Sequence, residues 1–210
     1  MELPNSFNEL TVRQFQEASR ILKFEGDLLE RHIQLIACLT NQTIDWVESH
    51  TPAQIGEMVK KLDFLLKPDV NKKPSKFLVL NKTVYSPILK METINWGQVK
   101  TIKVLGEKAE YDNQYLNQQL ACVYSKLNWY GKAVYSASDH AKKSQDLLDA
   151  KLGDVYGTLF FYSNVLEKLS PVIENSLKEA TQTIAETMPE IMKWAKENPQ
   201  ILAEAGLKVS

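Results

Sequence analysis

Three histidines and two cysteines are the side chains with the greatest potential for metal binding or nucleophilic chemistry. They are His32, His50, His140, Cys38 and Cys122. Two ligands on one helix face lie three or four residues apart. No two histidines have a spacing of four, and no glutamate stands three residues before a histidine, as a helical di-iron site requires. We therefore expect no metal site.

Catalytic and phosphate-binding motifs are also missing from the sequence. His140 follows Asp139, but adjacent residues on a helix point about 100° apart and cannot hold a base against its orienting acid. The glycines do not form a phosphate loop or a dinucleotide fingerprint. No serine lies in a nucleophile elbow or precedes a lysine by three residues. The sequence predicts a protein that binds other macromolecules, without a cofactor and without catalysis.

Two groups of residues are candidates for that binding. The basic group is a candidate for nucleic acid, with solvation of an exposed loop as the simpler explanation. It comprises Lys67, Lys72, Lys73 and Lys76, and ends at Phe77. The aromatic group runs from Trp129 to Tyr162, and most of its members fall on apolar helical stripes that predict core packing. Trp129 and Tyr130 remain as interface candidates.

The C-terminal segment, residues 189–210, is too apolar for an inert tail. Its apolar residues stand among charges, and the interface candidates are Ile191, Trp194, Ile201 and Leu202. We expect this segment to dock on its own chain or on a neighbouring subunit.

Composition narrows the class of protein. The chain has 210 residues, of which 44% are hydrophobic, which is sufficient for a core. The 25 basic and 26 acidic residues nearly cancel, so no overall field attracts nucleic acid or an anionic membrane. No basic leader opens the sequence, and no stretch approaches the roughly 18 apolar residues of a membrane span. We expect a soluble intracellular protein with its cysteines as buried free thiols.

The first 66 residues predict helices. Thr11 and Gln14 form a capping box, Asp27 is suited to cap a second helix that runs to about Thr40, and a short helix covers residues 44–48. Thr51, Pro52 and Gln54 combine a second capping box with proline at the first helical position. This helical unit is predicted to end in the polar loop of residues 67–76.

Beyond the loop, residues 77–80 and 83–89 predict a β-hairpin turning at Asn81 and Lys82, with Pro87 favouring an edge strand. Helices are predicted over 95–105 and 111–127, with Gly106 as the break. At an offset of 84 residues Gln14, Gln34, Ala37 and Cys38 align with identical residue types. The alignment suggests a duplicated helical pair, although about two such identities arise by chance.

After a loop or short strand at 129–135, a helix capped by Ser138 or Asp139 is predicted to reach about residue 152. Two further amphipathic helices follow, the last beginning at Ser170 and Pro171. The predicted fold class is mainly α, with helical pairs, a small β-hairpin insertion and a long helical C-terminal region. The expected organisation is a helical unit at 1–68, a loop and hairpin at 69–92, and a second helical unit at 93–210.

The opening unit resembles small helical proteins encoded among the head and tail genes of tailed bacteriophages, including tail assembly chaperones and virion proteins of crAss-like phages. The resemblance covers residues 8–125. The residues that carry it are Leu10, Thr11, Gln14, Phe15, Ile36–Thr40, Ile55, Leu62–Leu66 and Ile94–Gln98. The long C-terminal third departs from a compact chaperone and favours a structural part of the particle.

The resemblance implies a non-enzymatic phage particle protein of the neck, connector or tail, assembled in the cytoplasm of the host bacterium and retained in the virion. Its partners would be other phage structural proteins in a symmetric assembly. A tail assembly chaperone absent from the finished particle is the first alternative. A nucleic-acid-binding factor that uses the lysines of residues 67–76 is the second alternative. An enzyme without a recognisable catalytic motif is the third.

Overall fold

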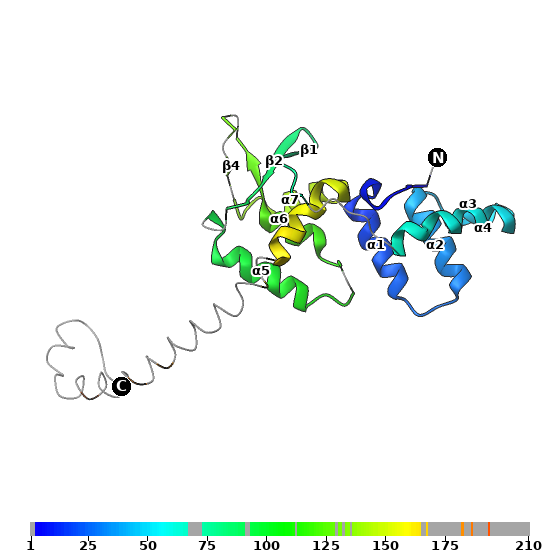
Figure 1. Ribbon diagram of the computed structural model, residues 1–210, viewed down its shortest axis with the longest axis horizontal. Coiled ribbons are helices and arrows are strands. Elements are labelled where there is room, and N and C mark those ends of the chain that lie inside the picture. The colour runs from blue at the N-terminus through cyan, green and yellow to red at the C-terminus, as the bar shows by residue number, and fades with distance from the viewer. Residues whose placement is uncertain are drawn as a thin grey trace. The chain divides into compact units, whose positions relative to one another are not determined.

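The computed structural model describes residues 3–66, 73–90, 93–111, 113–128, 130–131, 133–134 and 136–164, together with the single positions 167, 182, 186 and 193. The chain divides into two compact units, Met1–Phe161 and Tyr162–Ser210. The fold is mainly helical with a small antiparallel sheet, as predicted (Figure 1). In the second unit the described positions are helical, and most of the predicted C-terminal helices lie outside the described residues.

The N-terminal helices begin where the sequence predicts. A short 3₁₀ turn, η1 (Phe7–Glu9), precedes α1 (Val12–Lys23), α2 (Leu28–Thr40), α3 (Ile44–Glu48), α4 (Pro52–Lys60) and the 3₁₀ helix η2 (Lys61–Leu66). Both predicted capping boxes form, at Thr11 with Gln14 and at Thr51 with Gln54. The α1–α2 hairpin is held by buried apolar residues, among them Ala18, Ile21 and Ile36. The capping residues and the apolar stripes therefore predict the same helices in this region.

The sheet is larger than the predicted hairpin. Its order is β1 (Leu78–Leu80), β2 (Thr83–Pro87), β3 (Tyr124–Leu127) and β4 (Ala133–Val134), and all neighbours are antiparallel. The β1–β2 turn forms at Asn81 and Lys82 as predicted, with φ of 46° and 63°. Asparagine is among the residues that adopt this left-handed conformation most readily, and it suits a tight hairpin turn.

Two sequence predictions about this sheet are wrong. Pro87 does not lie on an edge strand, because β2 pairs with both β1 and β3. Proline is tolerated there because β1 pairs with β2 only as far as Tyr85, so no β1 residue requires an N–H donor at position 87. The helix predicted over 111–127 ends at Val123, and Tyr124–Leu127 becomes β3. Pairing with the distant β2 overrides the local helical pattern.

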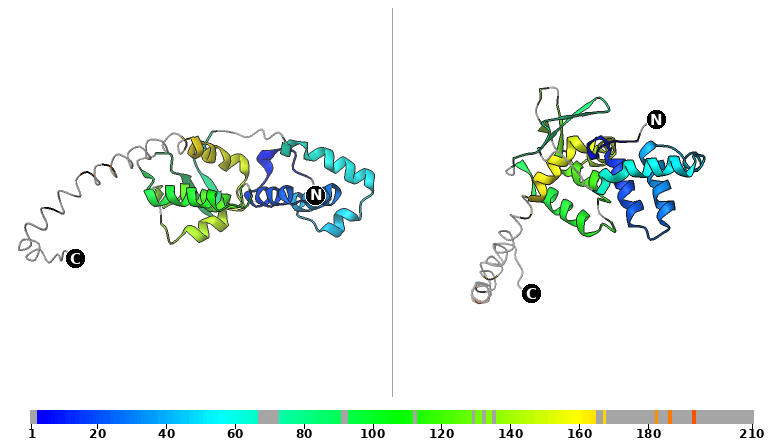
Figure 2. Two further views of the ribbon diagram at one scale, coloured as in Figure 1. Left: turned by 90° about the horizontal axis from the view of Figure 1, so that it is seen from below. Right: turned by 45° about the vertical axis from the view of Figure 1, so that its right-hand side comes forward.

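The second half contains α5 (Trp96–Glu107), α6 (Leu116–Val123) and α7 (His140–Leu147), and residues 152–161 are again helical. Gly106 lies inside the last turn of α5 instead of ending it. Asp139 stands at the N-cap of α7, but its side chain makes no capping hydrogen bond. In both views of Figure 2 the α1–α2 hairpin and α5 lie in different parts of the first unit. The predicted boundaries at residues 68 and 92 stay a prediction.

The two helical pairs share a side-chain hydrogen bond whose donors follow the predicted offset of 84 residues and whose acceptors differ from it by one residue. That offset places α1 directly on α5, and Thr11 on Asn95, which forms a third capping box with Gln98. Gln14 Nε2 donates to the carbonyl of Leu39 at 2.9 Å. Gln98 Nε2 donates to the carbonyl of Cys122 at 2.5 Å. In each pair, the side-chain amide of a buried glutamine in the first turn of one helix therefore bonds to a carbonyl in the last turn of the next helix. This shared bond supports a duplicated unit.

Candidate functional site

Among the described residues, the turn between α1 and α2 carries the largest group of exposed apolar side chains close together in sequence. We name this group the α1–α2 tip; it consists of Leu22 (47% exposed), Phe24 (62%), Leu28 (60%) and Leu29 (57%). The turn lies at the periphery of the first unit (Figure 1). Single exposed apolar residues are ordinary, whereas a cluster of this kind is typical of a surface that another molecule covers.

The backbone at the tip is fixed by a helix cap. The carboxylate of Asp27 accepts hydrogen bonds from the backbone N–H groups of Leu29 (3.0 Å) and Glu30 (3.1 Å). On the other side of the turn, the Arg20 guanidinium lies 5.6 Å from the centre of the Phe24 ring. A cation over an aromatic face restricts the ring. The tip is therefore a preorganised surface, which lowers the entropic cost of binding.

A groove of about 720 Å³ lies between α1 and α2 next to the tip. Side chains that line it include Arg20, Phe24, Asp27, Arg31, Gln34 and Cys38. Glu17 and Arg20 form an ion pair on its wall, and this pairing lowers the pKa of the Glu17 carboxyl. The groove adds hydrogen-bonding and charged groups beside an apolar patch, an arrangement that resembles the core and rim of a protein interface.

The two thiols are not suited to nucleophilic chemistry. Burial raises the pKa of Cys38 to about 11, and burial also raises the pKa of Cys122 to about 11. Cys38 is half-buried and its Sγ lies 3.8 Å from the carbonyl oxygen of Gln14, whereas Cys122 is buried. A reactive cysteine needs a lowered pKa and access to solvent.

Alkylation of these thiols in the native protein is accordingly expected to be slow. At pH 8 a thiol with a pKa of about 11 has a thiolate population on the order of 100-fold below that of an ordinary cysteine. Mass spectrometry of iodoacetamide adducts, in native buffer and in guanidinium chloride, measures the ratio of the two rates. Native Cys38 that reacts as fast as the unfolded chain would contradict the assigned environment.

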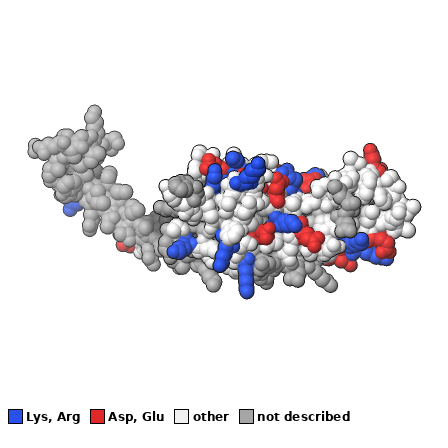
Figure 3. All heavy atoms as spheres, turned by 90° about the horizontal axis from the view of Figure 1, so that it is seen from above, with Lys and Arg blue, Asp and Glu red and all other residues white. Residues whose placement is uncertain are grey.

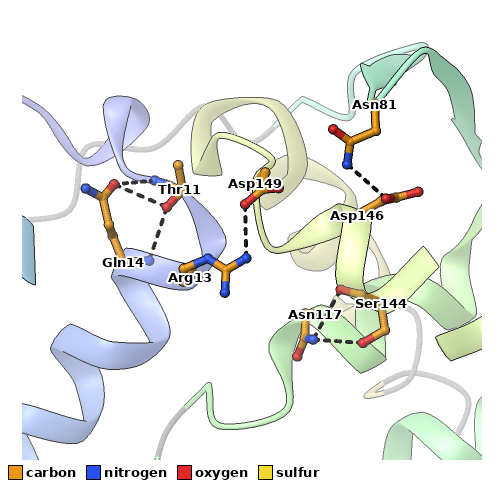
Figure 4. Close-up of polar contacts among 8 residues, drawn as sticks. All are labelled: Thr11, Arg13, Gln14, Asn81, Asn117, Ser144, Asp146 and Asp149. Atoms are coloured by element: carbon orange, nitrogen blue, oxygen red, sulfur yellow. Dashed lines mark hydrogen bonds and ion pairs between the residues drawn. The ribbon is translucent and has the colours of Figure 1, made fainter. Parts of the chain in front are cut away.

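A buried polar network joins α7 to the sheet. Asp146 accepts a hydrogen bond from the Tyr85 hydroxyl at 2.6 Å. It also accepts one from Asn81 Nδ2 at 2.9 Å (Figure 4). Lys143, only 1% exposed, donates to the carbonyl of Tyr124 at 3.1 Å, and burial lowers the pKa of its amine. The adjacent cavity measures about 70 Å³, far below the roughly 300–1,000 Å³ of ligand sites. These contacts indicate a structural role for the network.

Sequence reasoning missed this network. Lys143 and Asp146 lie three residues apart, and such a pair on a helix normally predicts a solvated face. Burial of both depends on β2 and β3, which approach α7 only in the folded protein. No signal in the local sequence distinguishes the two situations. The α1–α2 tip was missed for a related reason, because Leu22 and Leu29 continue the helical stripes that predict core packing.

The structure describes only some of the predicted site residues. Tyr130 is 73% exposed in the turn between β3 and β4, and Lys73 and Lys76 are exposed before β1. Because β1 and β4 form opposite edges of the sheet, the aromatic and basic candidates do not belong to one site. The residues that lie outside the described part of the chain are Trp129, Ile191, Trp194, Ile201, Leu202, Lys67 and Lys72.

Among the aromatic residues, Tyr156 is half-buried and contacts Phe7. Its ring lies edge-on to that of Phe7, with 6.1 Å between the centroids, and Phe7 in turn meets Phe15 at 4.9 Å. The predicted core packing is confirmed for Tyr162, which is 3% exposed, whereas Phe160 is 40% exposed and departs from the prediction. Next to Tyr156, the backbone of Lys73 approaches Gly157 so closely that an added Cβ would lie 2.2 Å from the Lys73 carbonyl oxygen. Glycine at 157 is what allows this segment to pass over the helix.

The described residues hold no group of three or more His, Cys, Asp or Glu side chains arranged to bind a metal ion. None of the helices that the structure describes has the length and apolar character needed to span a membrane. On the face shown in Figure 3, acidic and basic side chains are both present. Comparison of the chain with protein-family models, with curated proteins and with solved structures finds no match.

Proposed function

We propose that this protein is a non-enzymatic structural or assembly protein of a tailed phage particle, in the neck, connector or tail, that acts through protein–protein interfaces. The observation that carries the protein-binding part is the α1–α2 tip with its four exposed apolar side chains. The particle assignment is supported by the resemblance of residues 8–125 to small helical phage proteins. The proposed partners are neighbouring particle proteins in a symmetric assembly, and no cofactor is involved.

The energetics of the tip suit such a role. Full burial of one leucine or phenylalanine side chain contributes about 1.5–3 kcal/mol, so several covered together can anchor an interface. The backbone at Leu29 is held by the Asp27 cap and the Phe24 ring lies beside Arg20, so ordering this part of the tip on binding costs less entropy. In a closed assembly the same contact is repeated by every subunit, which multiplies its effect.

Leu28→Asp and Leu29→Asp are expected to block incorporation into particles while leaving the subunit folded. An aspartate in a covered apolar contact would be an unpaired buried charge, whereas in the free subunit both positions are exposed. Quantitative peptide mass spectrometry of purified particles and of the soluble fraction measures the effect. We expect at least about a tenfold loss from particles, the scale of a single interface hot spot.

Gly56→Asp is the matched control. It adds the same charge to an exposed position of α4 where a new Cβ meets no atom within 4 Å. Its incorporation should equal that of the unchanged protein. If the two leucine variants also enter particles normally, the tip is not the interface. If the unchanged protein is abundant in the lysate but absent from particles, the tail assembly chaperone replaces the particle protein as the best explanation.

A nucleic-acid-binding function is the second alternative, and one observation favours it. Lys73 and Lys76 are exposed, and the Phe77 side chain beside them is 61% exposed. Lysines with an adjacent exposed aromatic ring are typical of single-strand binding surfaces. Salt-dependent affinity for a single-stranded oligonucleotide, lost when these lysines are replaced, would favour this alternative.

A further inference from the structure

The N-terminal end of α1 is covered by another part of the same chain. The N–H of Val12 donates to the carbonyl of Ala150 at 2.9 Å, and the N–H of Arg13 donates to that of Leu148 at 2.9 Å. These N–H groups have no partner within their own helix. Leu148 and Ala150 belong to the turn that follows α7. Carbonyl groups just after the end of α7 therefore accept the hydrogen bonds of N–H groups at the start of α1.

Apolar and ionic contacts complete this junction. The N–H of Leu152 donates to the carbonyl of Leu10 at 2.8 Å, and the side chains of Leu10, Val12 and Leu152 are all fully buried. At the rim, Arg13 Nη2 lies 3.1 Å from Asp149 Oδ1 (Figure 4). Residues 148–152 thus form a lid of two carbonyl acceptors and an apolar side chain over the start of α1.

The corresponding end of α5 has the same cap, and none of the residues that the structure describes forms such a lid over it. At the offset of 84 residues Val12 corresponds to Trp96 and Arg13 to Gly97. Asn95 and Gln98 form the capping box that Thr11 and Gln14 form in the first pair. Trp96 is nevertheless 58% exposed, where Val12 is fully buried. Among the described residues, no acceptor meets the backbone N–H of Trp96 or Gly97.

We propose that the start of α5 is a docking site for a partner protein that presents the C-terminal turn of a helix followed by an apolar residue. Two carbonyls of that turn would accept the N–H groups of Trp96 and Gly97, as Ala150 and Leu148 accept those of Val12 and Arg13 in the first pair. The apolar residue would cover Trp96, by analogy with the first pair, where the Val12 and Leu152 side chains are both fully buried at the junction. Trp96 supplies the larger surface, because a tryptophan side chain buries about 150–250 Å².

The residue types refine the chemistry of the partner. Gly97 replaces Arg13, so the partner needs no counterpart of Asp149. An added Cβ at Gly97 would lie 3.1 Å from the capping oxygen Asn95 Oδ1, so glycine both preserves the cap and leaves the N–H open to approach. The inference rests on the proposed protein-binding function and not on the particle assignment. It concerns a surface separate in sequence from the α1–α2 tip.

A peptide copied from the lid of the first pair provides the probe. Residues 140–153 of this chain are synthesised with an i,i+4 staple at positions 141 and 145, which are exposed on α7. The staple is needed because a peptide of this length is a marginal helix in water. The peptide is titrated into the full ¹⁵N-labelled chain, and the amide signals of Trp96 and Gly97 and the indole N–H of Trp96 are followed by NMR.

We expect these three signals to shift with the added peptide and to saturate together. Trp96→Asp should weaken binding at least about tenfold, the effect of removing a hot-spot tryptophan, while Phe77→Asp, at another exposed aromatic position, should not. A peptide with aspartate at both positions 148 and 152 should not bind. Absence of shifts at Trp96 and Gly97, or shifts confined to Val12 and Arg13, would overturn the proposal.

The titration uses the isolated protein, so its outcome is independent of particle incorporation. Normal peptide binding combined with normal incorporation of the Leu28 and Leu29 variants would retain the docking site and reject the tip as an interface. Lost peptide binding combined with blocked incorporation of the Leu28 and Leu29 variants would reject the docking site at the start of α5 and retain the α1–α2 tip as an interface.

Discussion

Asp146→Ala is expected to lower the free energy of unfolding by about 2–4 kcal/mol, since hydrogen bonds to a charged group contribute about 1.5–3 kcal/mol each and are not fully additive. The carboxylate is 7% exposed and accepts from both Tyr85 and Asn81. The Tyr85 side chain is 2% exposed, so water cannot replace the lost acceptor without rearrangement. Burial and the neighbouring carboxylate together raise the pKa of the Tyr85 hydroxyl, which stays protonated and able to donate.

Urea unfolding followed by circular dichroism measures the loss, and two variants serve as controls. Asp146→Asn keeps the shape and one acceptor oxygen, so its loss should be smaller than that of alanine. Tyr85→Phe removes the donor without leaving a cavity. In a double-mutant cycle, the Asp146 and Tyr85 variants should show a coupling of about 1 kcal/mol or more, because the residues are in direct contact. A coupling near zero would contradict the structural role assigned to the network.

Gln98→Ala should destabilise the protein by a similar amount, about 2–3 kcal/mol, by combining a lost cap with a buried carbonyl left unpaired. The Gln98 side chain is 2% exposed, its Oε1 accepts from the backbone N–H of Asn95 at 2.9 Å, and its Nε2 donates to the carbonyl of Cys122. Gln14→Ala should have the same effect in the first pair, where Nε2 donates to the carbonyl of Leu39.

Gln54 offers a control for the local part of this effect. It forms the same capping box with Thr51 but is exposed, and its Oε1 accepts the N–H of Thr51 at 2.9 Å. Gln54→Ala removes the cap without leaving a buried carbonyl unpaired. We therefore expect the free energy of unfolding to fall by about 1 kcal/mol or less. Equal losses for Gln14, Gln54 and Gln98 in chemical denaturation would show that the long-range bond contributes nothing, and would remove the physical basis for the repeated unit.

The candidate surfaces were less predictable than the helices that present them. Leu22 and Leu29 fall in the pattern of core residues, and sequence alone does not show that these side chains are left exposed in the described structure. Trp96 is a clearer case, because the equivalent Val12 carries a similar pattern and is fully buried. The difference between these two positions is the segment 148–152, which covers one of them and comes from more than a hundred residues away.

The starts of the N-terminal helices were determined by sequence alone. Thr11, Asp27 and Thr51 cap helices with partners two or three residues away, so the interaction is complete within a short segment and needs no tertiary contact. The turn at Asn81 and Lys82 is local in the same way. Only the tertiary structure decided that Tyr124–Leu127 is a strand, that Pro87 ends an interior strand and that Lys143 and Asp146 are buried. Each of these depends on hydrogen bonds or packing between residues far apart in the chain, and such partners outweigh the small local preferences of a short segment.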